Sequence, residues 1–492
     1  MGSTGATATA DDLRRVLLFP LPYQGHINPM FQLAGLLHSR GFAITVFHTH
    51  FNAPDASRHP DYHFVPVPGD GGMPTPAGDS SPDTVQATVK HVLAVNRACE
   101  APFRELLAGL LARQPEREED VACLVADAHL MTMLDVAREL GVPTMALRTS
   151  SAARFRFFTA FPMLCDKGYL PARQESSSEL DDAPVVELPP YRVGDLPSAC
   201  SAAAHVNMRE VISRAVTAVM TSSGLILNTF DALESDELAS LRRDLPTAVP
   251  LFDVGPLHKL SPAASSSLLR QDRGCIDWLD AQPQGSVLYV SFGSLASMSS
   301  SDFEETAWGI AGSGRHFLWV LRPGLVPGAG AGEPPPLPDG FDAAAGGRCV
   351  VVRWAPQEEV LAHAAVGAFW THCGWNSTVE AVCAGVPMLC SPCIGDQMGN
   401  ARYVVDVWRN GLMLAGGEIE RGKVAAVAAL MGEGADELRR RAMELKSSAA
   451  ESIGEAGSSS IMVDKLILEL QRKRVERNIL CFEEHPQFRS PL

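Results

Sequence analysis

A chain of 492 residues, of which 46% are hydrophobic and 20% are charged, has a globular composition and enough length for two domains of roughly 200–250 residues each. Its formal net charge of −16 argues against a surface that binds nucleic acid or an anionic membrane. The polar N-terminus has no signal region, and no apolar run reaches the roughly 18 residues that span a bilayer, so we expect no integral membrane association. Eleven scattered cysteines suggest a reducing compartment, and we expect a cytoplasmic monomer.

Strands and helices alternate from the start of the chain. Residues 16–20 (VLLFP) predict a buried strand, and residues 29–40 predict a helix with Asn28 as its N-cap and Pro29 as its first residue. Such alternation is typical of a parallel sheet with helices on both faces. Further strands are expected at 43–47 and 121–126, and a further helix is expected near 129–140.

A second series of the same kind begins at residues 287–292 (VLYVSF). The Ser- and Pro-rich stretch between the two series has weak periodicity and predicts a linker. We therefore expect an α/β protein with two doubly wound domains and a cleft between them. The predicted parts are a first domain at 1–252, a linker at 253–285, a second domain at 286–458, a last helix at 459–472 and an atypical tail at 473–492.

The most specific segment of the chain is residues 354–397 (WAPQEEVLAHAAVGAFWTHCGWNSTVEAVCAGVPMLCSPCIGDQ). It contains an apolar strand, a turn at His372-Cys373-Gly374 and a helix that begins near Asn376. The N-terminus of a helix binds anions because its free backbone N–H groups and its dipole point at the incoming charge. An aromatic residue upstream and an acid–amide pair downstream suggest a ligand with a flat base, a phosphate and a polyol, which is a nucleotide sugar.

This segment resembles, without insertion or deletion, the signature of the plant family 1 UDP-glycosyltransferases, including its HCGWNS run. The resemblance extends to about residue 472. It implies the GT-B fold, in which two Rossmann-like domains face a cleft. The first domain would bind the acceptor and carry a catalytic histidine, the second would bind the UDP-sugar, and the last helix would cross back to the first domain.

His26 is the candidate general base. It lies between the first strand and its helix, and ligands of open α/β sheets bind at that carboxyl edge. A lone histidine with a near-neutral pKa is either a polar loop residue or a base for an acceptor hydroxyl. The surrounding GHINP run resembles the catalytic loop of the family and implies the base. Asp127, at the end of the 121–126 strand, would be its partner by resemblance, and it is also suited to cap the following helix.

The resemblance also implies the residues of the donor site. Diphosphate contacts would come from the helix N-terminus and from a loop after the 287–292 strand, whereas Glu380 would bind ribose or form a capping box with Ser377. A terminal Gln in the signature goes with glucose. The implied UDP contacts are Ser294, Trp354, Gln357, His372, Gly374, Asn376, Ser377 and Glu380, and the implied sugar contacts are Thr149, Trp375, Asp396 and Gln397.

No cofactor and no metal are expected. The sequence has no D-x-D run that would hold a metal against a diphosphate, and Cys390 and Cys393 form a C-x-x-C without a second ligand pair. The run at 328–332 is G-x-G-x-G in a Pro-rich loop rather than a dinucleotide-binding G-x-G-x-x-G. A nicotinamide-dependent oxidoreductase is therefore disfavoured.

Taken together, these residues predict an inverting O-glucosyltransferase that uses UDP-glucose and a small lipophilic acceptor. The alternative is a nucleotide-sugar-binding protein without transferase activity. The acceptor pocket is expected in loops at 68–100 and 149–210, which are rich in Phe and Met. The runs DKGYLP (166–171) and ELPPYRVGDLP (187–197) resemble the branch that contains grass benzoxazinoid, diterpenoid and cytokinin glucosyltransferases.

Overall fold

The computed structural model describes residues 14–69, 82–112, 121–171, 181–197, 201–261, 267–328, 332–414, 419–430 and 435–473. Of the predicted tail, only Lys473 is among them. Parts of the expected acceptor loops, at 70–81, 172–180 and 198–200, also lie outside the described residues.

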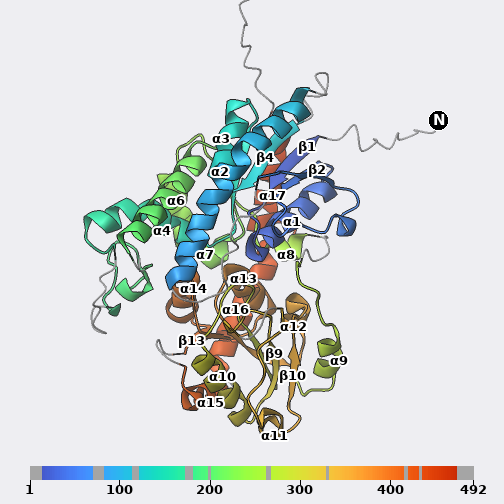
Figure 1. The fold of residues 1–492 in the computed structure, drawn as a ribbon, viewed down its shortest axis with the longest axis vertical. Coiled ribbons are helices and arrows are strands. Elements are labelled where there is room, and N and C mark those ends of the chain that lie inside the picture. The colour runs from blue at the N-terminus through green and yellow to red at the C-terminus, as the bar shows by residue number, and fades with distance from the viewer. Residues whose placement is uncertain are drawn as a thin grey trace, which may run out of the picture.

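The first domain is built on a parallel sheet of seven strands among the described residues (Figure 1). In sheet order these are β3 (His63–Pro66), β2 (Ala43–His48), β1 (Arg15–Phe19), β4 (Val121–Asp127), β5 (Thr144–Arg148), β6 (Leu225–Leu227) and β7 (Leu251–Asp253). The sheet thus extends to Asp253, where the predicted linker begins. Its helices are α1 (Gln24–Ser39), α2 (Pro82–Ala112), α3 (Met131–Glu139), α4 (Ala152–Asp166), α6 (Ala202–Met220), α7 (Asp231–Asp244) and α8 (Leu257–Leu260), with short turns η2 (Ala56–Arg58) and η4 (Val193–Asp195).

The second domain repeats this architecture on a smaller parallel sheet (Figure 1). In sheet order its described strands are β10 (Cys349–Val352), β9 (His316–Val320), β8 (Val287–Ser291), β11 (Val366–Thr371), β12 (Met388–Cys390) and β13 (Gly411–Met413). The remaining helices are α9 (Gly274–Asp280), α10 (Ser300–Gly312), α11 (Phe341–Ala345), α12 (Gln357–Ala362), α13 (Trp375–Ala384), α14 (Gln397–Arg402), η5 (Tyr403–Val407), α15 (Arg421–Leu430), α16 (Asp436–Ser452) and α17 (Ser458–Arg472).

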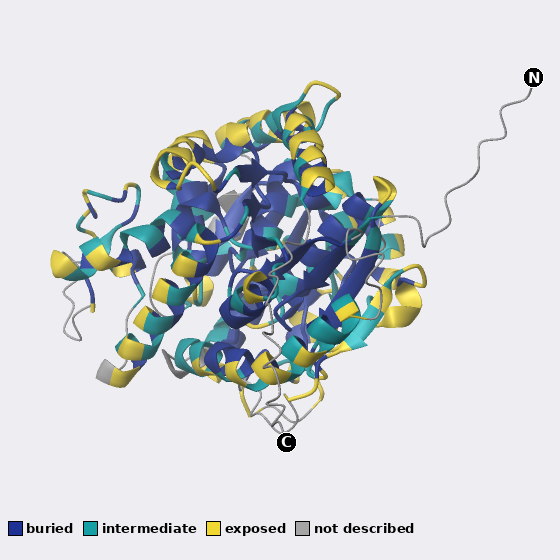
Figure 2. Ribbon diagram, turned by 90° about the horizontal axis from the view of Figure 1, so that it is seen from above, coloured by how far each residue is buried: buried dark blue, intermediate teal, exposed yellow. Residues whose placement is uncertain are grey.

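Both sheets are buried between layers of helices, as Figure 2 shows by the dark strands inside a paler shell. β4 is buried along its whole length, which is typical of a parallel strand covered on both faces. The last helix, α17, buries Val463, Leu466, Ile467 and Leu470, which lie on one face at helical spacing. That face packs in the first domain's core beside Val16. Because α17 follows the second domain in the sequence, its packing connects the two domains.

The helix after β1 begins earlier than the sequence suggests. Asn28 and Pro29 predict its start, but α1 begins at Gln24 with Tyr23 as N-cap, so that prediction is wrong. Asn28 does not cap the helix because it lies inside α1, and its side chain accepts a hydrogen bond from the side chain of Gln24, one turn earlier. His26 consequently lies in the first turn of α1 and not in a loop.

A contact from the second domain compensates for the proline inside α1. Pro29 has no N–H group, so the carbonyl of Gly25 lacks its partner four residues later. The side-chain amide of Asn376 donates to this carbonyl at 2.9 Å. A backbone group that helix geometry leaves open in one domain is thus satisfied by the other.

Candidate active site

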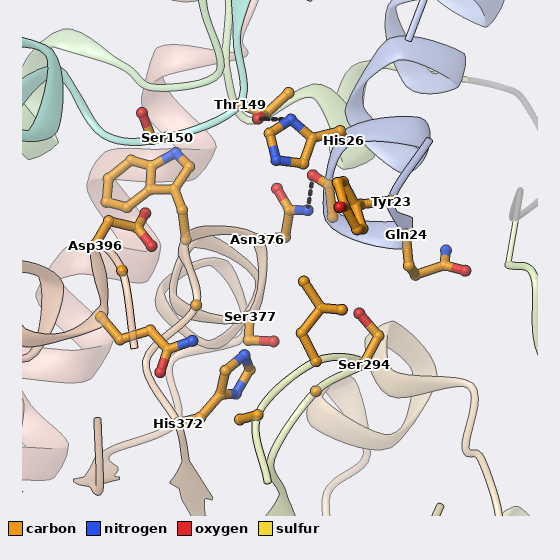
Figure 3. Close-up of a pocket in the computed structure, with 18 of the residues that line it drawn as sticks. Tyr23, Gln24, His26, Thr149, Ser150, Ser294, His372, Asn376, Ser377 and Asp396 are labelled. Atoms are coloured by element: carbon orange, nitrogen blue, oxygen red, sulfur yellow. Dashed lines mark hydrogen bonds between the residues drawn. The ribbon is translucent and has the colours of Figure 1, made fainter. Parts of the chain in front are cut away.

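A cavity of about 790 Å³ lies where the carboxyl ends of the two sheets face each other. Its lining comes from both domains, and Figure 3 shows His26 and Thr149 of the first domain opposite His372 and Ser377 of the second. The cavity brings together every predicted site residue except Asp127, which lies behind His26. The predicted residues that line it are His26, Thr149, Ser294, Trp354, Gln357, His372, Gly374, Trp375, Asn376, Ser377, Glu380, Asp396 and Gln397.

His26 and Asp127 form a hydrogen-bonded pair at the edge of this cavity. The His26 Nδ1 lies 2.6 Å from Oδ2 of Asp127, whose side chain is only 1% exposed. The hydroxyl of Thr149 lies 2.9 Å from the same nitrogen. With Nδ1 bonded to the carboxylate, the other ring nitrogen points toward the open middle of the pocket (Figure 3). A neutral imidazole in this orientation presents a free lone pair to a ligand.

The Asp127 carboxylate is ionised at neutral pH. Burial by itself would raise its pKa, but the positive charge of His26 and hydrogen bonds from His129 and His26 outweigh burial and hold the pKa well below its usual range. An ionised carboxylate stabilises the imidazolium that forms when His26 takes up a proton.

His129 is a second partner of Asp127 that sequence reasoning missed. Its backbone N–H donates to Oδ1 at 2.9 Å, and its Nδ1 lies 3.1 Å from the same oxygen. The His129 ring lines the pocket 5.7 Å from the ring of His26, centre to centre. His129 could have been identified from the sequence, because it lies two residues after Asp127 at the carboxyl edge of the sheet, where ligands bind.

The N-terminus of α13 opens into the cavity without a side-chain cap. Gly374 is the N-cap, and no side chain bonds to the first N–H groups of the helix among the described residues. These groups and the helix dipole are therefore available to an anion. The segment that the sequence singled out as an anion site has the backbone geometry of one.

The ring of His372 lies tightly between two glycines at this helix terminus. A Cβ atom at Gly293 or at Gly374 would come within 2.5 Å of the ring, so neither position has room for a side chain. Burial, with the charge of Arg322 adding to it, lowers the pKa of His372 to about 4. The ring is therefore neutral near pH 7, and it can donate one N–H to a phosphate oxygen without carrying a charge.

Gln357 connects several polar groups in the second domain's part of the cavity. Its amide nitrogen lies 2.9 Å from Oγ of Ser377 and 2.7 Å from the Glu380 carboxylate, while its oxygen accepts from the hydroxyl of Tyr289 at 3.1 Å. Burial, with Glu358 nearby, raises the pKa of Glu380 to about 8. The half-buried Trp354 lines the same part of the cavity.

A capping box of Ser377 and Glu380, the alternative to a ribose contact, is wrong. The helix already begins at Trp375, so Ser377 lies inside the first turn and is not the N-cap. The carboxylate of Glu380 accepts its hydrogen bond from Gln357 instead. Glu380 is therefore held toward the cavity by a side chain and not by the helix backbone.

The acid–amide pair lies at the start of α14. The oxygen of Gln397 accepts from the backbone N–H groups of Cys393 and Ile394, both at 2.8 Å, and only its NH₂ group remains for a ligand. Asp396 accepts from Asn400 at 3.2 Å and faces the cavity (Figure 3). Trp375 donates its indole N–H to the carbonyl of Asn228 in the first domain at 2.9 Å, so it shapes the cavity with its ring alone.

Comparison with known proteins agrees with this geometry. The sequence model of the family described as UDP-glucoronosyl and UDP-glucosyl transferase matches residues 269–446. DIMBOA UDP-glucosyltransferase BX8 of Zea mays is 49% identical over 461 residues, which cover 91% of this chain and 96% of that protein. UDP-glycosyltransferase 76F2 of Arabidopsis thaliana is 43% identical over 462 residues, which cover 92% and 96%. The chain belongs to the plant family 1 UDP-glycosyltransferases.

Solved structures show the same fold as this UDP-glycosyltransferase. The structure of Phytolacca americana UGT2 complexed with UDP-2fluoro-glucose and pterostilbene superposes with a TM-score of 0.74 at 28% identity, covering 93% of this chain and 99% of that one. Medicago truncatula UGT71G1 complexed with UDP-glucose gives a TM-score of 0.73 at 25% identity, covering 94% and 99%. The prediction of the GT-B fold is confirmed.

One group of side chains in this glycosyltransferase has metal-binding spacing. Ligand atoms of His26, Asp127 and His129 lie within 4.8 Å of one another. The same atoms already bond to each other, and a metal there would take the nitrogen that orients the His26 ring. Cys390 and Cys393 lie within the signature segment as free thiols. Among the described residues, no helix combines the length and the apolar character that crossing a bilayer requires.

Part of the cavity lies in the first domain of this glycosyltransferase, where the sequence predicts the acceptor to bind. Of the Phe and Met residues in the expected acceptor loop at 149–210, Phe158 and Met208 line the cavity, whereas Phe155, Phe157 and Phe161 are buried in the core and do not line it. Sequence reasoning missed the arginines of this region. Arg148, at the end of β5, and Arg154, on α4, both line the cavity, and Arg148 is only 2% exposed. Arg148 could have been found from the sequence, because a charged residue at the carboxyl end of a buried strand indicates a ligand site.

Proposed function

We propose that this glycosyltransferase moves glucose from UDP-glucose to a hydroxyl group of a small, largely apolar acceptor, with inversion at the anomeric carbon. The observation that carries the proposal is the pair of His26 and Asp127, 2.6 Å apart, which faces the uncapped N-terminus of α13 across one cavity. The base thus lies on one side of the cavity and the anion site on the other. In-line displacement requires this arrangement, because the acceptor attacks the anomeric carbon from the face opposite to the departing diphosphate. The names of the relatives, which include UDP-glucosyltransferases, support glucose as the sugar.

In the proposed reaction the acceptor hydroxyl gives its proton to Nε2 of His26 as its oxygen forms a bond with the anomeric carbon. The bond from that carbon to the diphosphate breaks, and UDP leaves with the electron pair. Asp127 stabilises the imidazolium, and the N–H groups of α13 with His372 stabilise the charge that develops on the diphosphate. The sugar is α-linked in UDP-glucose, so attack from the opposite face gives a β-glucoside.

The residues on the sugar side agree with this assignment. Asp396 and the free NH₂ group of Gln397 offer an acceptor and a donor to adjacent sugar hydroxyls, and Thr149 lies across the cavity beside His26. We propose that the reaction needs no metal, because the helix N-terminus supplies the charge stabilisation. We also propose a cytosolic location, which the nine free cysteines among the described residues support, and we propose that the protein is a monomer.

The test is a transfer assay with UDP-glucose and a panel of phenolics, hydroxamic acids, cytokinins and terpenoids. We expect UDP release that depends on an acceptor, and a product whose anomeric proton shows the β configuration. A protein that binds UDP-glucose without releasing UDP with any acceptor would instead be the nucleotide-sugar-binding protein of the alternative hypothesis. An α-glucoside would rule out direct displacement by an acceptor that His26 activates.

A further inference from the structure

Two arginines, the buried Arg148 and the half-buried Arg154, lie on the acceptor side of the cavity. The guanidinium carbon of Arg148 lies 4.3 Å from the ring centre of Phe158, and that of Arg154 lies 5.3 Å from the same centre. Both cations therefore pack on one aromatic ring that itself lines the cavity. Cationic side chains are rarely buried without an anionic partner, because removing a charge from water is costly.

The arginines lack such a partner in the described part of the chain. The Nε and Nη1 atoms of Arg148 are buried without a hydrogen-bond acceptor, and only its Nη2 is bonded, to the hydroxyl of Ser150 at 3.1 Å. The guanidinium of Arg154 has no hydrogen bond and no ion pair with a described residue, although it packs on Phe157 as well as on Phe158. Both guanidinium groups thus have N–H donors for which the described residues offer no acceptor.

The nearby carboxylates are already engaged. Asp127 accepts from both His26 and His129. Asp195, which also lines the cavity, bonds the Arg402 side chain through both oxygens at 2.9 and 3.0 Å. Asp396 contributes a favourable field at the arginines without an ion pair to either. Burial lowers the pKa of both arginines, that of Arg148 to about 10, so Arg148 remains charged at neutral pH.

Much of the remaining acceptor side is apolar, and it connects the arginines to the base. Its lining includes Leu21, Val89, Val92, Met208 and Ile212. The ring of His129 lies 5.7 Å from His26 and 6.1 Å from Phe158, centre to centre. A small ring system placed against His129 and Phe158 would therefore have one end at His26 and the other end at the guanidinium groups.

We propose that the acceptor of this glycosyltransferase is an aromatic or similarly flat compound that carries an anionic oxygen group, which Arg154 and Arg148 bind while a separate hydroxyl faces His26. The inference rests on the proposed function and names its substrate class. Carboxylates, hydroxamates and phenolates share the required chemistry, because each offers an ionised oxygen to a guanidinium. The apolar lining binds the ring, and the arginines select the charge and orient the hydroxyl.

The test compares anionic compounds with their neutral amides, using hydroxybenzoates and hydroxycinnamates. Binding is measured by calorimetry in the presence of UDP, so it does not require turnover, and transfer from UDP-glucose is measured separately. The variant is Arg154→Met, because Arg154 is half-buried and its loss threatens the fold less than the loss of Arg148. Arg209→Met is the matched control, since Arg209 is exposed on α6, the helix that contributes Met208 to the cavity.

We expect the wild type to bind anionic members at least about tenfold more tightly than their amides, as a charge-assisted hydrogen bond in a buried site would produce. Arg154→Met should weaken binding of the anions about 10- to 100-fold, change binding of the amides by less than about twofold, and raise KM for the anions more than it lowers kcat. Arg209→Met should behave as the wild type. Arg154→Lys should keep part of the preference for anions that Arg154→Met loses. Lys retains the positive charge but lacks the planar guanidinium group that can bind two oxygens at once.

Equal binding of anions and amides, a loss in Arg154→Met that is the same for both, or no binding of any anionic member would overturn the inference. Selective binding of anions without glucose transfer to any acceptor would refute the proposed function and leave the inference standing. Transfer to amides as efficient as transfer to anions would refute the inference alone.

Discussion

Replacement of Asp127 by Asn should inactivate the enzyme more severely than replacement by Ala. The reason is the geometry of the carboxylate. The backbone N–H of His129 donates to Oδ1 at 2.9 Å, and a backbone N–H can only donate. In the Asn variant, the amide oxygen must therefore occupy the Oδ1 position, and the amide NH₂ must face Nδ1 of His26, 2.6 Å away in the native pair. That contact places the His26 proton on Nε2, and the ring no longer presents a lone pair to the acceptor.

The Ala variant lacks the charge but keeps the useful tautomer. The hydroxyl of Thr149, 2.9 Å from Nδ1 of His26, remains to accept the proton of that nitrogen. Loss of one hydrogen bond to a charged group costs about 1.5–3 kcal/mol, or about 10- to 150-fold in rate. We therefore expect Asp127→Ala to lower kcat by about that factor and Asp127→Asn to lower it by about 10³-fold or more. Thr149→Val should have a larger effect in the Ala variant than in the wild type.

The assay is kcat and KM from release of UDP at saturating UDP-glucose, with Tm and UDP affinity measured for each variant to establish that the fold and the donor site are intact. His26→Ala/Asp127→Ala should be no slower than His26→Ala alone, because the two residues act as a unit. An Asn variant that is as active as the Ala variant would refute the assignment of the His26 tautomer. Full activity of Asp127→Ala would refute the role of the pair.

Further outcomes follow from the same site. His26→Ala should lower the rate of transfer by about 10²–10⁴-fold while UDP-glucose affinity stays within a few-fold, and near-normal turnover would exclude His26 as the base. Activity should survive excess EDTA; a strict requirement for Mn²⁺ or Mg²⁺ would show that α13 does not suffice for the diphosphate. UDP-glucose should exceed UDP-galactose and UDP-glucuronate by at least about tenfold in kcat/KM, and Gln397→His should erode that preference, whereas equal use of the three donors would show that Gln397 does not read the sugar. Gly374→Ala should weaken UDP binding measured by calorimetry, because its Cβ would lie 2.5 Å from the His372 ring; unchanged affinity would contradict the tight packing of that ring.

The sequence by itself determined the fold class and the family. Most of the residues predicted for the donor site lie in one continuous segment, 354–397, and its strand, turn and helix follow from local pattern. His26 and Asp127 were also accessible, because both follow predicted strands and the carboxyl ends of parallel strands meet at one edge. Local periodicity and short-range motifs are properties of neighbouring residues, so they can be read without coordinates.

Only the tertiary structure decided where α1 begins and what the acceptor side of the cavity contains. The carbonyl that Pro29 leaves open in the first turn of α1 is satisfied by Asn376, which lies 351 residues away in the sequence. The role of Glu380 likewise depends on Gln357, which lies on a different helix. That Arg154 has no hydrogen bond or ion pair from its side chain to a described residue follows only from the coordinates of its neighbours. Such features arise from contacts between distant segments, and burial and pairing belong to the folded chain rather than to any local pattern.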